Sequence, residues 1–384
     1  MKVIINSCDF KNAIAKVAPA VGKSTYFSAL ESIKISAANG MITATATNAE
    51  DFLNIDIHGR IIENGECYMK YDELKKMVFK GDDITLETTV GHVHISSSKK
   101  SYEMVRNDLS DSFPETPVLN SKTEVSLISG EILSNLKPLS AMAHPEPEVC
   151  HGTLNAIRFD MEKQRLIALD EHRIGVWNLP ESDTMASFTI GLGCVGILKS
   201  AIGKSDRKIL VVCDGKHARF EGEDFTYITR CIEGHYYDID KIVGDAKKTY
   251  DYKLGLDNKE VSEIAKEYKK GLKADDRRPM LFVGNKNGLA TSFSFQTFMT
   301  ADRIEKVKWN YYTSSSEQFH KAVNPLFIVD ACAFLGDDVE IRSTYSSKTP
   351  MYFCEGDKEV LILPVNFTGE DNRLMTLAIE QLTA

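Results

Sequence analysis

The chain of 384 residues has no run of 18 apolar residues, so nothing in it predicts a membrane-spanning helix. Residues 1 to 10 lack the charged and then apolar segments of a signal peptide, and we expect a soluble, cytoplasmic protein. None of the eight cysteines forms a closely spaced pair. This spacing favours free thiols in a reducing cytosol over a disulfide framework or a zinc site.

An excess of positive charge is also missing. The 46 Lys and Arg residues are outnumbered by 55 Asp and Glu residues, which gives a formal net charge of −9. Such a balance predicts solubility and argues against a uniformly basic nucleic-acid binder.

The chain repeats a strand-entry sequence. Phe-Lys-Gly-Asp-Asp-Ile-Thr-Leu at residues 79 to 86 returns as Phe-Leu-Gly-Asp-Asp-Val-Glu-Ile at residues 334 to 341. A fainter copy follows an apolar helix at residues 202 to 211, where Gly203 precedes a polar turn and a β-branched strand. Three copies of one unit are therefore expected.

A second pattern supports the same count, because period-two spacing changes to helical spacing three times. The apolar positions are Val3, Ile5, Phe10, Ile14 and Val17; then Val125, Leu127, Ile132, Leu136 and Leu139; then Leu254, Leu256, Val261, Ala265 and Tyr268. Where the strand spacing changes to helical spacing, each copy has a polar residue that could cap the helix: Ser7 or Asp9, Ser129 and Asp257. A third echo pairs residues 111 to 114 with residues 234 to 238.

These repeats predict three domains of about 125 residues each. We place them at residues 1–122, 123–248 and 249–384, with boundaries in the polar stretches 117–122 and 244–248. The last domain includes a tail, residues 367–384, in which Leu374, Leu377, Ala378 and Leu382 have helical spacing.

Short alternating strands separated by Gly, Asn and Asp turns indicate antiparallel sheet. In the first copy we expect strands at residues 2–6, 32–38, 41–47, 52–58, 65–69, 84–88, 92–96 and 101–105, and helices at residues 10–17 and 71–79. The predicted fold class is α+β, repeated.

The strongest enzymatic signal is a GxGxxG run at Gly191, Gly193 and Gly196, followed by Asp214 at the end of the next strand. The corresponding segments of the other copies contain no glycines, and the helix is short for a parallel crossover. Glycines that open a helix between antiparallel strands are the favoured interpretation. A nicotinamide-dependent enzyme remains the alternative, and calorimetry with dinucleotides would test it.

Other candidate motifs are incomplete. Gly22-Lys23-Ser24 and Gly203-Lys204-Ser205 lack the first glycine of a phosphate loop. His92 and His94 share a strand face but have no third ligand in register, and Asp170 to Arg173 has no assignable nucleophile. We expect no catalytic residue, metal or cofactor.

Lysines gather on the predicted helices although the chain is acidic. Each one alone is best explained as part of a solvated helix face, but their recurrence in three copies predicts one electropositive surface. The set is Lys11, Lys16, Lys23, Lys75, Lys76, Lys137, Lys199, Lys204, Lys269 and Lys270.

Residues outside the repeats carry a family resemblance. Residues 142–144 (Met-Ala-His), 154–155 (Leu-Asn) and 170–174 (Asp-Glu-His-Arg-Ile) occur in the order of the middle-domain motifs of bacterial sliding clamps. The segments 111–114 and 234–238, Asn324 with Phe327, and residues 362–365 (Ile-Leu-Pro-Val) match further motifs. The chain thus resembles the sliding-clamp family, the β subunit of DNA polymerase III, over nearly its whole length.

The resemblance implies a ring-shaped homodimer of three clamp-type domains per subunit, with sheets outside and helices inside. Such a ring encircles double-stranded DNA without sequence specificity, through the helix lysines, and is a processivity factor, not an enzyme. Its implied partners are the replicative DNA polymerase α subunit, the clamp loader and other proteins with a clamp-binding motif. A protein scaffold that binds no DNA remains a second alternative, because a repeat alone does not require DNA.

The resemblance also implies a pocket for the partners' apolar peptide. Its lining would be Leu154, His172, Arg173, Ile174, Lys241, Ile242, Asn324, Phe327, Leu363, Pro364 and Val365. Arg173, Lys241 and Asn324 would fix the polar end of the peptide. The chain departs from the family pattern at Glu171, Tyr237, Asn366 and Ser24, in the acidic loop 145–151, and in the tail 367–384, which we expect to pack near the pocket and compete with partners.

Overall fold

The computed structural model describes residues 1–23, 27–79, 81–106, 109–110, 112–119, 124–146, 152–180, 185–270, 279–285, 288–293, 303–307, 309–314 and 319–365. The chain divides into two compact units. The first comprises residues 1–137 and 181–233, and the second comprises residues 138–180 and 234–384. Within the described residues, no helix combines the length and the apolar character needed to cross a membrane.

The first unit contains two antiparallel sheets, with strand orders β5-β1-β7-β8-β9 and β10-β15-β16-β17-β4-β3-β2-β6. Their strands are β1 (Lys2–Asn6), β2 (Ser32–Ala38), β3 (Met41–Thr47), β4 (Asp51–Ile57), β5 (Gly59–Glu63), β6 (Gly65–Lys70), β7 (Asp83–Thr88), β8 (His92–Ser96), β9 (Ser101–Val105), β10 (Glu124–Ser129), β15 (Lys208–Cys213), β16 (His217–Glu221) and β17 (Phe225–Arg230). The helices of this unit are α1 (Ser7–Val17), α2 (Tyr71–Leu74), α3 (Gly130–Ser134) and α5 (Gly193–Ile202), with 3-10 turns at Ala18–Ala20 and Ser28–Glu31. Strand β14 (Phe188–Gly191) precedes α5, and α4 (Lys137–Ser140) begins where the chain passes into the second unit.

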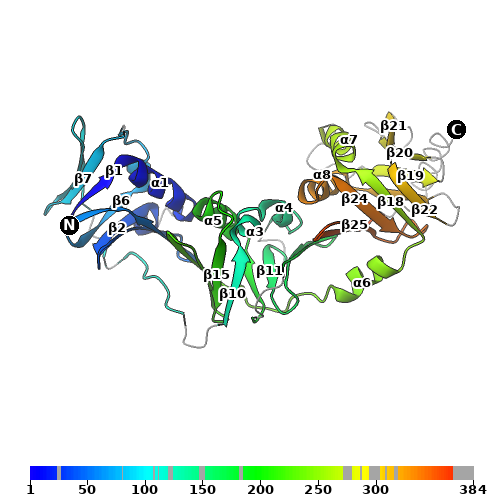
Figure 1. Cartoon of the computed structure of the whole chain (residues 1–384), viewed down its shortest axis with the longest axis horizontal. Coiled ribbons are helices and arrows are strands. Elements are labelled where there is room, and N and C mark those ends of the chain that lie inside the picture. Colours follow the sequence, from blue (N-terminus) through cyan, green and yellow to red (C-terminus); the bar gives the residue numbers. More distant parts are fainter. Residues whose placement is uncertain are drawn as a thin grey trace. The chain divides into compact units, whose positions relative to one another are not determined.

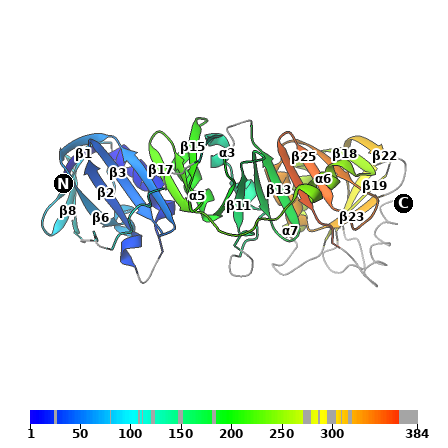
Figure 2. The ribbon, with the colours of Figure 1, turned by 90° about the horizontal axis from the view of Figure 1, so that it is seen from below.

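The second unit contains eight strands of one sheet, in the order β11-β12-β13-β26-β25-β24-β18-β22, and a second sheet with the order β21-β20-β19-β23. These strands are β11 (Ala156–Asp160), β12 (Arg165–Leu169), β13 (Arg173–Asn178), β18 (Tyr252–Asp257), β19 (Met280–Asn285), β20 (Gly288–Phe293), β21 (Arg303–Val307), β22 (Trp309–Ser314), β23 (Phe319–Val323), β24 (Asp338–Ser343), β25 (Met351–Glu355) and β26 (Lys358–Ile362). Helices α7 (Asn258–Lys270) and α8 (Pro325–Phe334) lie side by side against this sheet (Figure 1). Helix α6 (Asp240–Lys248) packs on β24 and β25 (Figure 2).

One strand order occurs three times in the structure, in agreement with the three copies that the sequence predicts. One antiparallel run appears as β1-β7-β8-β9, as β10-β15-β16-β17 and as β18-β24-β25-β26. The first two strands of each run are in equivalent register, because Ile5 pairs with Ile84, Ile128 with Ile209 and Leu256 with Val339. A helix follows the first strand in each copy: α1, α3 or α7.

Neighbouring copies share sheets, which explains why the chain forms two compact units. Strand β17 of the second copy pairs with β4 of the first, and β26 of the third copy pairs with β13 of the second. The second copy therefore contributes one set of strands to each unit. The predicted limits of three domains stay a prediction, and residues 244–248, placed in a linker, belong to helix α6.

The repeated Gly-Asp-Asp sequence is a turn that supports the start of a helix. The carbonyl of Asp82 accepts a hydrogen bond from the N–H of Ser7, the first residue of α1. Equivalent bonds join Gly130 to the carbonyl of Arg207 and Asn258 to the carbonyl of Asp337. Because the first N–H groups of a helix have no partner within the helix, these carbonyls replace one missing contact in each copy.

Two details of the predicted repeat are wrong. Asn6, not Ser7 or Asp9, caps α1, since its side chain accepts the N–H of Cys8 at 2.9 Å. In β10, Ser126 and Ile128 are buried, whereas Val125 and Leu127 are 46% and 43% exposed. The paired register makes Ile128 the counterpart of Ile5, and a shift of one residue moves every side chain to the other face.

The predicted elements of the first copy are otherwise close to those observed. Strand β5 was not predicted, and α2 ends at Leu74, short of the expected residue 79. Gly191 ends β14, and Gly193 and Gly196 lie in the first turns of α5. Within the described residues the next strand, β15, pairs only antiparallel, with β10 and β16. A parallel βαβ unit is absent there, so the favoured interpretation of these glycines is confirmed.

Candidate peptide-binding pocket and lysine-bearing helices

A pocket of about 250 Å³ opens on the second unit. Its walls come from β12, β13, α6, β26 and the chain segments before and after them. The lining residues are Leu154, Leu169, Asp170, Glu171, His172, Arg173, Ile174, Tyr237, Ile239, Ile242, Leu361 and Leu363.

The floor of the pocket belongs to a hydrophobic cluster in which Leu154, Leu169, Ile239 and Leu361 are at most 6% exposed. The rim differs from the floor. Tyr237, Ile242 and Leu363 are 49%, 49% and 39% exposed, so large apolar side chains of two separate segments meet water around one opening. Apolar surface concentrated in this way is typical of binding sites.

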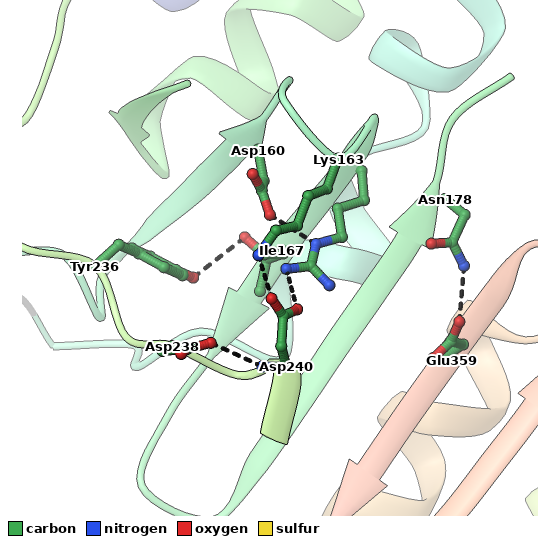
Figure 3. A network of polar contacts seen from close by, with 9 residues as sticks. Asp160, Lys163, Ile167, Asn178, Tyr236, Asp238, Asp240 and Glu359 are labelled. Atoms are coloured by element: carbon green, nitrogen blue, oxygen red, sulfur yellow. Dashed lines mark hydrogen bonds and ion pairs between the residues drawn. The ribbon is translucent and has the colours of Figure 1, made fainter. Parts of the chain in front are cut away.

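A polar network fixes the start of α6 beside the pocket (Figure 3). The carboxylate of Asp240 contacts Lys163 and also Arg165, the latter at 2.6 Å. The hydroxyl of Tyr236 donates to the carbonyl of Ile167 at 3.5 Å. The hydrogen bond from Lys163 lowers the pKa of Asp240, and burial raises the pKa of Tyr236. These contacts hold α6 against β12 and so keep Ile239 and Ile242 at the pocket.

The β12–β13 turn is built around Asp170. Its Oδ1 accepts the N–H groups of His172 and Arg173, at 2.8 and 2.9 Å, which is an Asx-type turn. Its Oδ2 accepts the Nε of Arg173 at 2.9 Å. The segment Asp170 to Arg173, to which no nucleophile could be assigned, is therefore a structural turn.

Arg173 is almost fully buried, at 6% side-chain exposure. Besides Asp170, its Nη1 donates to Asp330 on α8 at 2.6 Å, and its guanidinium lies 4.4 Å from the ring centre of Phe327. The rings of Phe327 and His172 stack at 5.9 Å. Arg173 thus joins the β12–β13 turn to α8 and has little exposed surface for a ligand.

The structure brings together Leu154, His172, Arg173, Ile174, Ile242 and Leu363 of the predicted lining. Phe327 stands behind His172 and does not reach the pocket, and Lys241 is exposed on α6 next to Ile242. Asn324 caps α8, its side chain accepting the N–H of Leu326. Pro364 is buried, and the N–H of Val365 donates to the carbonyl of Ala322.

Sequence reasoning missed Leu169, Asp170, Glu171, Tyr237, Ile239 and Leu361 as lining residues. Two of them, Glu171 and Tyr237, had drawn attention only as departures from the family pattern. The spacing of Ile239 and Ile242 on one helix face was an available signal. Asn366 and the tail 367–384 lie outside the described residues.

The predicted DNA-binding lysines are placed at the helices and the turns after them. Lys16 is half-buried. The other nine lysines are exposed: Lys11, Lys23, Lys75, Lys76, Lys137, Lys199, Lys204, Lys269 and Lys270. Lys16 forms an ion pair with Asp224 at 2.6 Å, and Lys75 forms one with Asp72 at 2.5 Å. The hydrogen bond from Asp72 raises the pKa of Lys75.

Of the phosphate-loop motifs, Ser24 lies outside the described residues, and the Oγ of Ser205 accepts the N–H of Arg207 at 3.2 Å. His92 lies 3.5 Å from Glu103 across a hairpin. Within the described part of the chain, no three His, Cys, Asp or Glu side chains are grouped as a metal site requires.

Comparisons with known proteins point in one direction. No family model matches the chain. The "Beta sliding clamp" of Lactococcus lactis is 23% identical over 271 residues, which cover 67% of this chain and 70% of the relative. The DNA polymerase sliding clamp of Bacillus subtilis has a TM-score of 0.82 at 16% identity, covering 96% of this chain and 100% of that structure.

A third similar protein carries a bound peptide. The Helicobacter pylori β clamp, solved with a DNA ligase peptide, has a TM-score of 0.76 at 20% identity and covers 95% of this chain and 100% of its own. The fold of the present chain is therefore the fold of these proteins.

Proposed function

Because this chain belongs to the family of bacterial β sliding clamps, we propose that it is a DNA sliding clamp. Two copies form a ring around duplex DNA and hold the replicative polymerase and other partners on it. The chain supplies no reaction of its own, because its contribution is topological: a closed ring cannot leave DNA sideways. We expect this role in the cytoplasm.

The observation that carries the proposal is the repeated joint between copies. In both units the last strand of the four-strand run, β17 or β26, pairs antiparallel with β4 or β13 of another copy. In the first copy the strand equivalent to β17 and β26 is β9, and in the third copy the strand equivalent to β4 and β13 is β21. Each is the outermost strand of its sheet within the described residues. Pairing of β9 with β21 of a second copy would form the same joint twice more and remove these open edges.

The edge of β9 has the right polar groups for this pairing. Arg106 donates to the carbonyl of Gly91, and Ser97 donates to the carbonyl of Lys100, across the β8–β9 pair. Because bonded residues alternate in an antiparallel pair, the N–H and C=O of Glu103 face away from β8. They are available to a strand of the partner.

The lysines are assigned to DNA in this proposal. They are spread over the helices of all three copies, and most are exposed. Contacts between ammonium groups and phosphates carry no sequence information, so the ring remains free to move along the duplex. The three-domain division, at residues 1–122, 123–248 and 249–384, is part of the same proposal.

The pocket is assigned to partner peptides. An apolar floor with exposed apolar side chains at the rim suits leucine or phenylalanine anchors of a short segment. The ligase peptide on the related clamp supports this class of ligand. Partners would include the polymerase α subunit, the clamp loader and other proteins with such a segment.

The test is retention on DNA of two topologies. The protein is loaded onto nicked circular DNA with its clamp loader and ATP, and the DNA is then linearised or left intact before gel filtration. We expect retention on the circle and loss from the linear form. Equal retention on both forms would identify an ordinary DNA binder, and no retention on either would favour a protein-only scaffold.

A further inference from the structure

The pocket carries an unbalanced negative charge. Among its lining residues, Asp170 and Glu171 are acidic and Arg173 is basic. The single cation is bonded to two carboxylates, Asp170 and Asp330. Asp170, Glu171, Asp330 and Arg173 together carry a formal charge of −2.

Of these charged residues, Glu171 is the one whose side chain is accessible to a ligand. Its side chain is exposed at the turn between β12 and β13 and makes no ion pair or hydrogen bond within the described residues. Asp170, by contrast, is 7% exposed and is occupied by the turn and by Arg173. The negative charge offered to a ligand is thus the carboxylate of Glu171.

Arg173 cannot offset the negative charge of Glu171 when an acidic group of a ligand approaches. Its guanidinium has 6% exposure, two carboxylate partners and a ring at 4.4 Å. Freeing it for a ligand would leave Asp170 and Asp330 buried or half-buried without their partner, which is costly. A carboxylate of a peptide at this rim would meet repulsion from Glu171 with no free cation among the lining residues.

We propose that Glu171 determines the specificity of the pocket, which prefers an apolar peptide with a lysine or arginine beside its hydrophobic anchors. The anchors occupy the floor formed by Leu154, Ile239 and Leu361, and the cation lies against the carboxylate of Glu171. This inference rests on the proposed function, because it names the chemistry of the peptide that the same pocket takes. Charge pairs at the edge of an interface select partners more than they add affinity.

The experiment uses the full chain and three fluorescent peptides that share the same leucine and phenylalanine anchors. They differ at one flanking position, which is Lys, Gln or Glu. At low ionic strength we expect the Lys peptide to bind roughly threefold to tenfold more tightly than the Glu peptide, the range of an exposed charge pair replaced by a repulsive one. The difference should shrink in 1 M salt, where charges are screened within about 3 Å.

Variants separate the charge effect from the pocket itself. Glu171→Gln should remove most of the preference while the Gln peptide keeps its affinity, and Glu63→Gln, at an exposed glutamate of the first unit, should change neither. Ile242→Ser should weaken all three peptides alike, because it removes an anchor contact.

Each contrary result has a distinct meaning. Equal or tighter binding of the Glu peptide, or a preference that survives Glu171→Gln, would overturn this inference and leave the pocket proposal intact. Failure of all three peptides to bind, or binding that Ile242→Ser does not weaken, would overturn the assignment of the pocket and this inference with it.

Discussion

Arg173 and Asp330, which are 157 positions apart in the chain, are joined by a hydrogen bond of 2.6 Å. One lies at the start of β13 beside the pocket and the other lies on α8. The bond gives the second copy's turn and the third copy's helix a fixed relation within the second unit. It also changes the role expected for Arg173, which supports the pocket wall from behind.

Replacing Asp330 tests this support. We expect Asp330→Asn to lower the free energy of unfolding by about 1–2 kcal/mol, because the carboxylate that pairs with the buried guanidinium is replaced by a neutral amide, a weaker acceptor. Denaturant unfolding followed by circular dichroism measures the change. Asp337→Asn, at an exposed residue after the same helix, is the control and should have little effect. Equal stability of the two variants would show that the Arg173–Asp330 bond contributes nothing.

The proposed dimer can be tested at the open edge of β9. We expect Glu103→Pro to shift the protein from dimer to monomer in sedimentation velocity, because proline removes an N–H that faces the proposed partner. The β8–β9 pair should persist, since the N–H of Glu103 does not donate to β8. Leu127→Pro, at an outward-facing position of the edge strand β10, is the matched control. A Glu103→Pro variant that remains a dimer at low concentration would contradict the proposed joint.

The helix lysines should govern the salt dependence of DNA binding. Reversing Lys11, Lys76 and Lys199 to Glu should weaken retention on loaded circular DNA and reduce the slope of log K against log salt. Each lost phosphate contact removes about 0.9 from that slope. Fluorescence anisotropy over a salt series measures it.

The matched control reverses three exposed lysines in turns between strands: Lys99, Lys216 and Lys348. Both triple variants change the net charge equally, so a general effect of charge would appear in both. If the turn variant loses as much affinity as the helix variant, the assignment of DNA to the helix surface is wrong.

The repeat made much of this fold predictable. Strands β1, β2, β3, β8 and β9 have the expected limits, because polar turns at both ends mark each alternating run. The order of the sheets was not readable from the sequence, since pairing of β17 with β4 joins residues that no local pattern connects. The predicted register of β10 was wrong by one residue. Val125 and Leu127 have the spacing of core residues but are exposed, and Ser126 and Ile128 are the buried residues of this strand.

The pocket was predictable in part for a related reason. Leu154, His172 and Ile174 came from motifs that keep their order along the chain. The role of Arg173 could not be predicted from a motif, because its partner Asp330 lies on a helix of another copy, 157 positions away in the chain. Tertiary contacts, and not sequence spacing, decide whether a cation is free for a ligand.

A buried lysine gives the stability of the second unit a pH dependence. Lys321 on β23 is fully buried, and its Nζ donates to the carbonyl of Thr349 at 2.9 Å, to the Oγ1 of Thr349 at 3.0 Å and to the carbonyl of Ser346. Burial lowers the pKa of Lys321 to about 7 from an ordinary value of 10.5. Within the described residues no carboxylate forms a hydrogen bond with it, and the neutral acceptors and the more distant charge of Asp251 only partly offset the burial.

The sign of the dependence follows from proton binding. Between pH 7 and about 8 the unfolded chain keeps a proton on Lys321 and the folded chain releases it, so the free energy of unfolding rises with pH. Above that range the buried thiols and tyrosines, whose pKa values burial raises, reverse the trend, because the unfolded chain loses their protons first. Denaturant unfolding at several pH values from about 7 to about 8 should show the rise in the wild-type protein. In Lys321→Met the rise should be absent, and a variant with the wild-type slope would assign the pH dependence to another group.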